Sequence, residues 1–327
     1  MVIELTLSGE DDLVLFCKRL IFIFVNFNKE YKKRKYRMKG FNIIVLAKQV
    51  PDTRNVGKDA MKADGTVNRG ALEAIFNPED LNALEQALRI KDNYPGTKVT
   101  VVTMGPGRAS EVIREAMYRG ADCGYLVTDR KFAGSDTLAT SYAISLAVKK
   151  LNPDVVIAGR QAIDGDTAQV GPQVAEKLNL PQVTYAEEIL KVAKNSITVK
   201  RRLERGIEIV ESKLPLVITV HSSAPDCRAR NAKYVMKYKH AHTVSELQDI
   251  AEDYLQLQKD RPYLQINEWT VDDLKADVDL LGLSGSPTKV KKIENVVFKA
   301  KEAKVMDAEK ESVDTLIKEL IENHTIG

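Results

Sequence analysis

A polar loop between a strand and a helix carries the residues best suited to chemistry. An apolar run of strand length ends at Gly159, and a helical pattern begins at Val170. Between them stand a cation, Arg160, and two carboxylates, Asp164 and Asp166. Free backbone N–H groups at the start of a helix bind anions such as phosphate. The loop therefore predicts an anion or nucleotide site, although an ordinary capped turn explains the same residues.

The charged residues of this loop allow more than one interpretation. Carboxylates such as Asp164 and Asp166 can hold a metal, but cap and turn roles come first, because a carboxylate beside a phosphate repels it. We therefore expect both to bind loop backbone while Arg160 supplies positive charge. The N–H donors expected at the helix start belong to Thr167, Ala168, Gln169 and Val170.

Other motifs for nucleotides or metals are weak or missing. The first core strand runs into residues 47–52 without a glycine, and the glycines at 105 and 107 lack the third glycine of a dinucleotide fingerprint. The histidines are scattered, and the cysteines have no C-x-x-C spacing, so we expect neither a metal site nor a disulfide framework. A free-standing NAD dehydrogenase is disfavoured for the same reasons.

Composition excludes some classes of protein. A net charge of +3 argues against a nucleic-acid binder, and 44% hydrophobic residues are ordinary for a globular protein. The widely spaced cysteines fit a reducing cytoplasm. The apolar stretch 13–27 is too short, and too charged at Lys18 and Arg19, to insert into a membrane. Residues 1–37 are either a helical extension or a translated leader.

Strands and helices alternate from residue 41 onward. Apolar runs predict strands at 41–47, 99–104, 124–127, 154–158 and 216–220. Helical patterns occupy 78–91, 109–119, 136–150 and 170–178, with Asn77 as the cap before Pro78. Continuous apolar strands that alternate with helices predict a parallel sheet covered on both faces.

The pattern changes in the second half of the chain. Short extended segments at 187–193, 196–203 and 206–213 predict an antiparallel ribbon. Helices are expected at 244–258 and 312–323, with irregular structure at 262–285 and a polar arm at 284–310. The predicted fold is a parallel-stranded, Rossmann-like α/β nucleotide-binding sheet with a short antiparallel ribbon and an extended C-terminal arm. Its parts are an extension (1–37), a nucleotide- or flavin-binding domain (38–239) and a helical insertion with the arm (240–327).

The polar loop resembles a long family signature. Residues 159–172, GRQAIDGDTAQVGP, look like the signature of the electron transfer flavoprotein β subunit, and further motifs match at 47–52, 76–80, 104–106 and 119–122. The resemblance covers about residues 38–326. It implies an adenine-nucleotide-binding α/β domain and an obligate partner, the α subunit. It also implies that Ala47, Asn77, Met104 and the turn 167–170 surround the nucleotide.

The same resemblance leaves two cofactors open. Housekeeping members of the family hold AMP at this place, whereas electron-bifurcating members hold an FAD that receives hydride from NADH. Residues 129–140 resemble the bifurcating branch, in which the small Gly134 and the hydroxyls of Ser135 and Thr137 leave room for a larger cofactor. A simple helix cap at Ser135 or Asp136 explains these residues without a ligand. We favour FAD, with AMP as the alternative.

By family analogy, the protein passes electrons from NADH to ferredoxin and to a flavin dehydrogenase, and no acid–base residue of this chain is required. The family's loop for acyl-CoA dehydrogenases carries an exposed leucine, but here residues 227–237 are basic and lack it. A 2-hydroxyacid dehydrogenase therefore stands beside an acyl-CoA type as partner. The alternative functions are an electron shuttle with structural AMP and a nucleotide sensor of the universal-stress type.

The residues expected to bind the cofactor come from well-separated segments of the chain. They are Ala47, Lys48, Asn77, Met104, Gly134, Ser135, Thr137, Gly159, Arg160, Asp164, Asp166, Thr167, Ala168, Gln169 and Val170.

Overall fold

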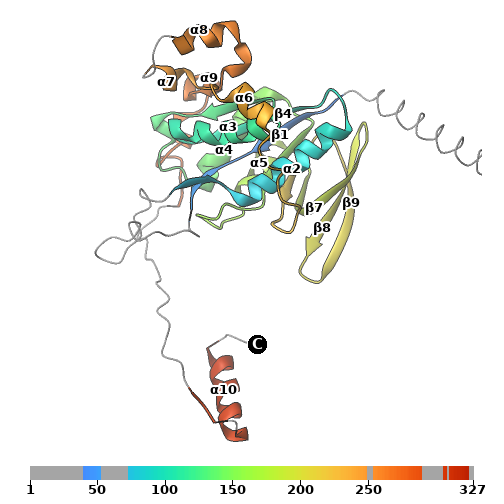
Figure 1. The fold of residues 1–327 in the computed structure, drawn as a ribbon. Coiled ribbons are helices and arrows are strands. Elements are labelled where there is room, and N and C mark those ends of the chain that lie inside the picture. The colour runs from blue at the N-terminus through green and yellow to red at the C-terminus, as the bar shows by residue number, and fades with distance from the viewer. Residues whose placement is uncertain (1–39, 53–72, 249–252, 289–304, 308, 324–327) are drawn as a thin grey trace, which may run out of the picture.

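A nine-stranded sheet forms the centre of the protein (Figure 1). The computed structural model describes residues 40–52, 73–248, 253–288, 305–307 and 309–323, so the predicted extension 1–37 lies outside the described residues. The strand order is β11-β5-β4-β1-β6-β10-β7-β8-β9. The central parallel strands are β5 (Cys123–Val127), β4 (Lys98–Met104), β1 (Asn42–Leu46), β6 (Val155–Gly159) and β10 (Leu216–Val220). The predicted parallel α/β fold is confirmed.

Helices cover both faces of this sheet. Successive side chains of a strand point to opposite faces, so each strand contributes to two clusters. Ile43 and Val45 of β1 pack in one core cluster with residues of α2 (Pro78–Asn93) and α3 (Ser110–Arg119). Ile44 and Leu46 pack in a second cluster with residues of α4 (Thr137–Leu151) and α5 (Val170–Leu178). Burial on both faces explains why these strands are apolar throughout.

The order in which successive strands add to the sheet reverses at β1. Strands β4 and β5 lie on one side of β1, and β6 and β10 lie on the other. The loops that leave β1 and β6 therefore diverge and open a crevice at the carboxyl ends of the strands, which is where open α/β sheets bind ligands.

The predicted antiparallel ribbon is present and longer than expected. It consists of β7 (Gln182–Val192), β8 (Ser196–Leu203) and β9 (Gly206–Lys213). Strand β7 begins five residues earlier than predicted, because its first part pairs parallel with β10 before the strand turns to pair antiparallel with β8. Tyr185 lies at this change with a φ of 58°. A separate pair, β2 (Gln49–Pro51) and β3 (Ala74–Phe76), precedes α2.

The single helix predicted at 244–258 is wrong. The structure has α7 (Val244–Leu247) and α8 (Asp253–Asp260) instead. A capping box between Thr243 and Glu246 begins α7, and Gln248 donates its N–H to the carbonyl of Ser245, only three residues back. That tighter bond closes the last turn of α7, and residues 249–252 lie outside the described residues.

Residues 262–285, predicted as irregular, contain a strand and a helix. Strand β11 (Asn267–Trp269) adds to the sheet edge parallel to β5, and α9 (Val271–Leu274) follows. The Trp269 ring lies 4.1 Å from that of Tyr125. A three-residue strand is too short to show a periodic pattern. The boundary expected near residue 240 stays a prediction, although β11 joins the sheet that earlier residues build.

The last helix, α10 (Lys310–Glu322), confirms the predicted one within two residues. None of its residues is buried, and Val313, Leu316 and Ile317 expose an apolar side. It lies apart from the sheet in Figure 1. The remaining elements are α6 (Ala232–Tyr238) and short 3-10 turns at Gly107–Ala109, Arg130–Phe132, Pro262–Leu264 and Val278–Leu280. In the described part of the chain, no helix is long and apolar enough to cross a membrane.

Candidate functional site

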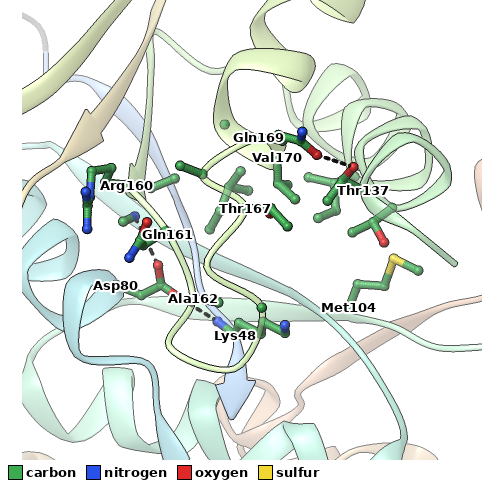
Figure 2. A pocket seen from close by; sticks show the side chains of 18 of the residues that line it. Lys48, Asp80, Met104, Thr137, Arg160, Gln161, Ala162, Thr167, Gln169 and Val170 are labelled. Atoms are coloured by element: carbon green, nitrogen blue, oxygen red, sulfur yellow. Dashed lines mark hydrogen bonds between the residues drawn. The ribbon is translucent and has the colours of Figure 1, made fainter. Parts of the chain in front are cut away.

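A pocket of about 340 Å³ opens at the carboxyl ends of β1, β4 and β6 (Figure 2). This volume lies at the small end of the range of roughly 300–1,000 Å³ for small-molecule sites. Apolar side chains form one part of its wall: Leu46, Ala47, Val102, Met104, Ile144 and Ala158. Polar groups from the loop 159–171 and from the start of α4 form the rest.

The carboxylate of Asp80 fixes the floor of this pocket. Asp80 lies in the first turn of α2 and is 7% exposed. One carboxylate oxygen accepts the N–H of Lys48 at 2.8 Å, directly after β1, and the other accepts the N–H of Gly159 at 3.0 Å, at the end of β6. One side chain therefore satisfies backbone donors of two neighbouring strands where their ladder ends. The sequence-based predictions missed Asp80, because its partners are distant in sequence.

Two neighbours of Asp80 hold the loop itself. Glu79 accepts the N–H of Gln161 at 2.9 Å. The amide of Asn77 donates to the carbonyl of Gln161 at 2.9 Å and accepts the N–H of Ile163 at 3.2 Å. Asn77 occupies the cap position of α2, as predicted, but its side chain makes no cap hydrogen bond. Residues 77–80 thus form a hook that clamps the loop 159–163.

The charged residues of the loop are paired with other side chains. The Arg160 guanidinium lies 3.0 Å from Glu79, which raises the Arg160 pKa and neutralises the positive charge expected there. Lys48 binds the Asp164 carboxylate at 2.7 Å, and Gln161 donates to Asp166 at 2.9 Å. The expectation that the two aspartates bind loop backbone was wrong, because these longer side chains reach them first. The described residues contain no group of His, Cys, Asp and Glu suited to a metal.

Two helices begin at the pocket, and they differ in their caps. In α4 the Asp136 carboxylate accepts the N–H groups of Leu138 and Ala139, so this helix start is already occupied by an anion. In α5 the preceding residue, Gln169, makes no side-chain cap hydrogen bond. The N–H groups of the first helical turn have no partner within a helix. The start of α5 is therefore the better place for an external anion.

The backbone before α5 adopts a conformation that L-residues rarely occupy. Ala168 has a φ of 52° and Asp166 a φ of 47°, whereas Gln169 has a φ of −102°. Successive residues of opposite backbone hand turn their N–H groups into one concavity, called a nest, that binds anions. A non-glycine residue in the left-handed region costs roughly 1–2 kcal/mol. Such strain beside a pocket supports a functional role for the turn.

A hydrogen bond spans the mouth of the pocket. Thr137, at the start of α4, donates its hydroxyl to the Gln169 side-chain oxygen at 2.8 Å (Figure 2). Ser135 donates to the carbonyl of Phe132 at 2.7 Å, so protein groups already account for its hydroxyl. Gly134 is not among the residues that line the pocket. Its φ of 77° lies in the left-handed region that favours glycine, and a Cβ on it would also meet the Leu283 side chain at 2.7 Å, so the fold accounts for this glycine without a ligand.

The structure brings most of the predicted residues together. Those that line the pocket are Ala47, Lys48, Met104, Ser135, Thr137, Gly159, Arg160, Asp166, Thr167, Ala168, Gln169 and Val170. Asn77, Gly134 and Asp164 lie outside this lining. The prediction omitted Asp80, Gln161 and Thr140, which also line it. The motif at 76–80 was the one signal that pointed toward Asp80.

Comparison with known proteins places the chain in a family. A family profile described as "Electron transfer flavoprotein domain" matches residues 64–243. The chain belongs to the electron transfer flavoprotein family. The electron transfer flavoprotein subunit beta of Clostridium acetobutylicum is 42% identical over 285 residues, which cover 87% of this chain and all of that protein. The sequence-based recognition of the family is confirmed.

Two relatives in the same family carry more specific names. The acryloyl-CoA reductase electron transfer subunit gamma of Anaerotignum propionicum is 42% identical over 288 residues, or 87% of this chain and 99% of that protein. The caffeyl-CoA reductase-Etf complex subunit CarD of Acetobacterium woodii is 42% identical over 250 residues, or 76% and 85%. Both names describe parts of reductase assemblies.

The basic segment 227–237, whose second part is α6, is less positive than its sequence implies. Arg228 binds Glu85 at 2.9 Å and Asp92 at 2.8 Å, and Arg230 pairs with Glu115. These arginines attach the loop to α2 and α3. Their charge is balanced within the chain, so the basic composition alone says little about an acidic partner.

We expect Gly159→Ala to destabilise the fold. A Cβ at Gly159 would lie 2.3 Å from Asp80 Oδ1 and 2.8 Å from the Glu79 backbone carbon, so strand and helix must separate. Overpacking of this kind costs about 1–3 kcal/mol. Gly165→Ala is the matched control in the same loop, because nothing lies within 4 Å of its Cβ position. Urea denaturation of both variants checks this. Equal stability of the two variants would contradict the close approach.

Asp80 should make the free energy of unfolding fall as the pH rises, whereas most carboxyl groups make it rise. Burial raises the pKa of Asp80 to about 7, against the hydrogen bonds from Asn77, Lys48 and Gly159. Between about pH 4 and pH 7 the folded state holds a proton on Asp80 that the unfolded state has released. The contribution of this proton to the free energy of unfolding is therefore full below about pH 4 and is lost as the pH rises through 7. We expect Asp80→Asn to remove that fall in the free energy of unfolding.

The comparison must be made between wild type and variant. Burial lowers the pKa of His242 below its ordinary value of 6.5, so this residue contributes a slope of opposite sign on the acid side of that value in both proteins. Urea midpoints measured from pH 4.5 to 8 give the difference directly. Parallel curves for wild type and Asp80→Asn would show that Asp80 is charged throughout.

Proposed function

We propose that the chain is the cytoplasmic β subunit of an electron transfer flavoprotein that binds FAD, takes electrons from NADH and bifurcates them between ferredoxin and a partner flavin dehydrogenase. The observation that carries the nucleotide site is the start of α5, where an uncapped helix follows the nest at Ala168 and Gln169 beside an apolar-walled pocket. The free thiols of Cys123 and Cys227 fit a reducing compartment.

The pocket has the chemistry of an adenine nucleotide site. The apolar wall, which includes Ala47 and Met104, suits a heteroaromatic base, and the backbone donors at 167–170 suit a phosphate. A volume of about 340 Å³ suits a mononucleotide. This fit is common to FAD and to AMP, and the resemblance at 129–140 is what favours FAD.

Each protein group then has a definite task. The α5 start binds phosphate, the hook at residues 77–80 keeps the loop in place, and Thr137 and Gln169 border the exit toward solvent. A bound FAD would supply acceptance of a hydride from NADH and release of single electrons. No acid or base of this chain is needed for either process.

The surface and the relatives support the proposed partners. The unburied apolar side of α10 fits a helix that docks on the α subunit. The relatives named after acryloyl-CoA and caffeyl-CoA reductases support a dehydrogenase or reductase of the acyl-CoA type, and a 2-hydroxyacid dehydrogenase stays the second candidate. A shuttle with structural AMP is the alternative function, and a nucleotide sensor without a flavin is the alternative from another class.

Gln169→Pro tests the phosphate turn. Proline removes the Gln169 N–H and disfavours the present backbone of Ala168, so the nest is lost. We expect affinity for AMP or FAD to fall at least about 100-fold, which is the loss of two charge-assisted hydrogen bonds of about 1.5 kcal/mol each. Gln169→Ala is the control, because it keeps the N–H and removes only the bond to Thr137. Equilibrium binding with circular dichroism as a check of folding distinguishes them. Retained affinity in the proline variant would refute the turn.

Cofactor stoichiometry tests the function itself. The chain is co-expressed with its α subunit, and flavin and AMP are counted in the purified complex from absorbance and chromatography of the released nucleotides. Two flavins per heterodimer, with NADH oxidation that depends on ferredoxin, is the expected result. One flavin with one AMP would replace the proposal by the shuttle, and no flavin would replace it by the sensor.

A further inference from the structure

Both cations in the described lining of the pocket are already matched by carboxylates. Lys48 and Arg160 are the only lysine or arginine side chains among these lining residues. Lys48 lies 2.7 Å from the Asp164 carboxylate, and Arg160 lies 3.0 Å from that of the buried Glu79. Neither cation therefore adds net positive charge to the pocket. An anion that enters it finds backbone N–H groups at the start of α5 rather than an unpaired cation.

Two carboxylates of the lining, Asp136 and Asp166, have neutral partners. The Oδ1 atom of Asp136 accepts two backbone N–H groups of the first turn of α4, and its Oδ2 atom accepts the N–H and the hydroxyl of Thr288. Asp166 accepts the side-chain amide of Gln161 at 2.9 Å. None of these donors is charged, so both aspartates keep their negative charge beside the pocket.

Asp136 stays ionised at neutral pH. Desolvation alone would raise the pKa of this carboxyl, but the hydrogen bonds from Thr288, Ala139 and Leu138 outweigh it and lower that pKa. The start of α4, which could otherwise receive an anion, is therefore already occupied by one. A ligand cannot place a second phosphate there without meeting this carboxylate.

The two aspartates lie on either side of the turn that is proposed to bind phosphate. Asp166 comes directly before the turn 167–170. Asp136 comes directly before Thr137, whose hydroxyl reaches Gln169 in that turn at 2.8 Å (Figure 2). One phosphate at the start of α5 thus has donors from the backbone, whereas charge added beyond it has carboxylates as neighbours.

We propose that Asp136 and Asp166 set an upper limit on the charge of the nucleotide, so that the pocket accepts AMP and FAD and rejects ADP and ATP. The inference rests on the proposed function, which supplies the adenine nucleotide. AMP and FAD each carry about two negative charges at neutral pH, whereas ADP and ATP carry about three and four. Sites for nucleoside triphosphates supply a lysine and a magnesium ion to the outer phosphates, and here both cations are engaged elsewhere.

ADP-ribose separates charge from size. It is larger than ADP, but its outer phosphate is esterified and carries about one negative charge fewer at neutral pH. A limit on charge therefore makes ADP-ribose the better ligand of the two, and a limit on size makes it the worse one.

The test is calorimetric titration of AMP, ADP, ATP, ADP-ribose and FAD into the full-length chain, freed of bound nucleotide and with EDTA present. In the wild type we expect the dissociation constant to rise at least about 10-fold from AMP to ADP and again from ADP to ATP, because each step adds a charge close to two carboxylates. ADP-ribose should bind more tightly than ADP.

Asp166→Asn removes one of the charges with little change of structure. Asparagine keeps an oxygen that accepts from Gln161, and it tolerates the φ of 47° found at this position. We expect the ratio of the ADP and AMP dissociation constants to fall at least about 3-fold in this variant, and to about 1 in Asp136→Asn/Asp166→Asn. Raising the salt from about 0.1 M to about 1 M shortens the Debye length from about 10 Å to about 3 Å, so it should narrow the wild-type ratio as well.

Two controls separate charge from structure. Asp136→Asn also disturbs the bonds from Thr288, and Thr288→Val loses the hydroxyl bond while the Asp136 charge remains, so this variant should keep the wild-type ratio. Glu204→Gln removes one negative charge from the exposed turn between β8 and β9, and it should also leave the ratio unchanged.

The outcomes distinguish this inference from the proposed function. A wild type that binds ADP as tightly as AMP, an unchanged ratio in the double variant, or ADP-ribose that binds more weakly than ADP would each overturn the limit on charge alone. A wild type that binds neither AMP nor FAD would overturn the proposed function, and the limit on charge with it.

Discussion

The pocket depends on one buried carboxylate that joins the ends of two strands. Parallel strands leave N–H groups without partners where their ladder stops, and an unpaired buried donor costs about 1–3 kcal/mol. Asp80 satisfies the N–H of Lys48, two residues after β1 ends, and the N–H of Gly159, the last residue of β6. Without this bridge the loop 159–163 would have no fixed origin, and the turn before α5 would have no fixed position.

The site combines order on one side with strain on the other. The hook at residues 77–80 satisfies the first half of the loop almost completely, whereas the second half keeps Asp166 and Ala168 in the left-handed region and leaves α5 without a side-chain cap. A rigid first half can hold such a turn, because its hydrogen bonds outweigh a strain of about 1–2 kcal/mol per residue. No side-chain carboxylate of the described residues caps the α5 start. The α4 start differs, because Asp136 already occupies it.

Local pattern was enough to predict the central sheet, since strands buried on both faces are continuous apolar runs and their helices begin at Pro78 and Val170. The site loop was found for the same reason, because it is one contiguous segment. The hook was not, since Asp80 and Gly159 are 79 residues apart and no local pattern records such a pair. Strand β11 was missed because pairing with β5, and not its own three residues, makes it a strand. The contact between the Gly134 position and Leu283, which is far along the chain, is likewise not visible in any local pattern.

The distance in sequence between hook and loop also has a kinetic consequence. Between Asp80 and Gly159 the chain contributes β4, α3, β5 and α4. This whole stretch must be in place before the hydrogen bond from Gly159 to Asp80 can form. Contacts between residues so far apart in sequence form slowly, because the entropy of closing the intervening loop is lost first. The pocket therefore cannot be complete before the chain has been made through Gly159 and these intervening elements have folded.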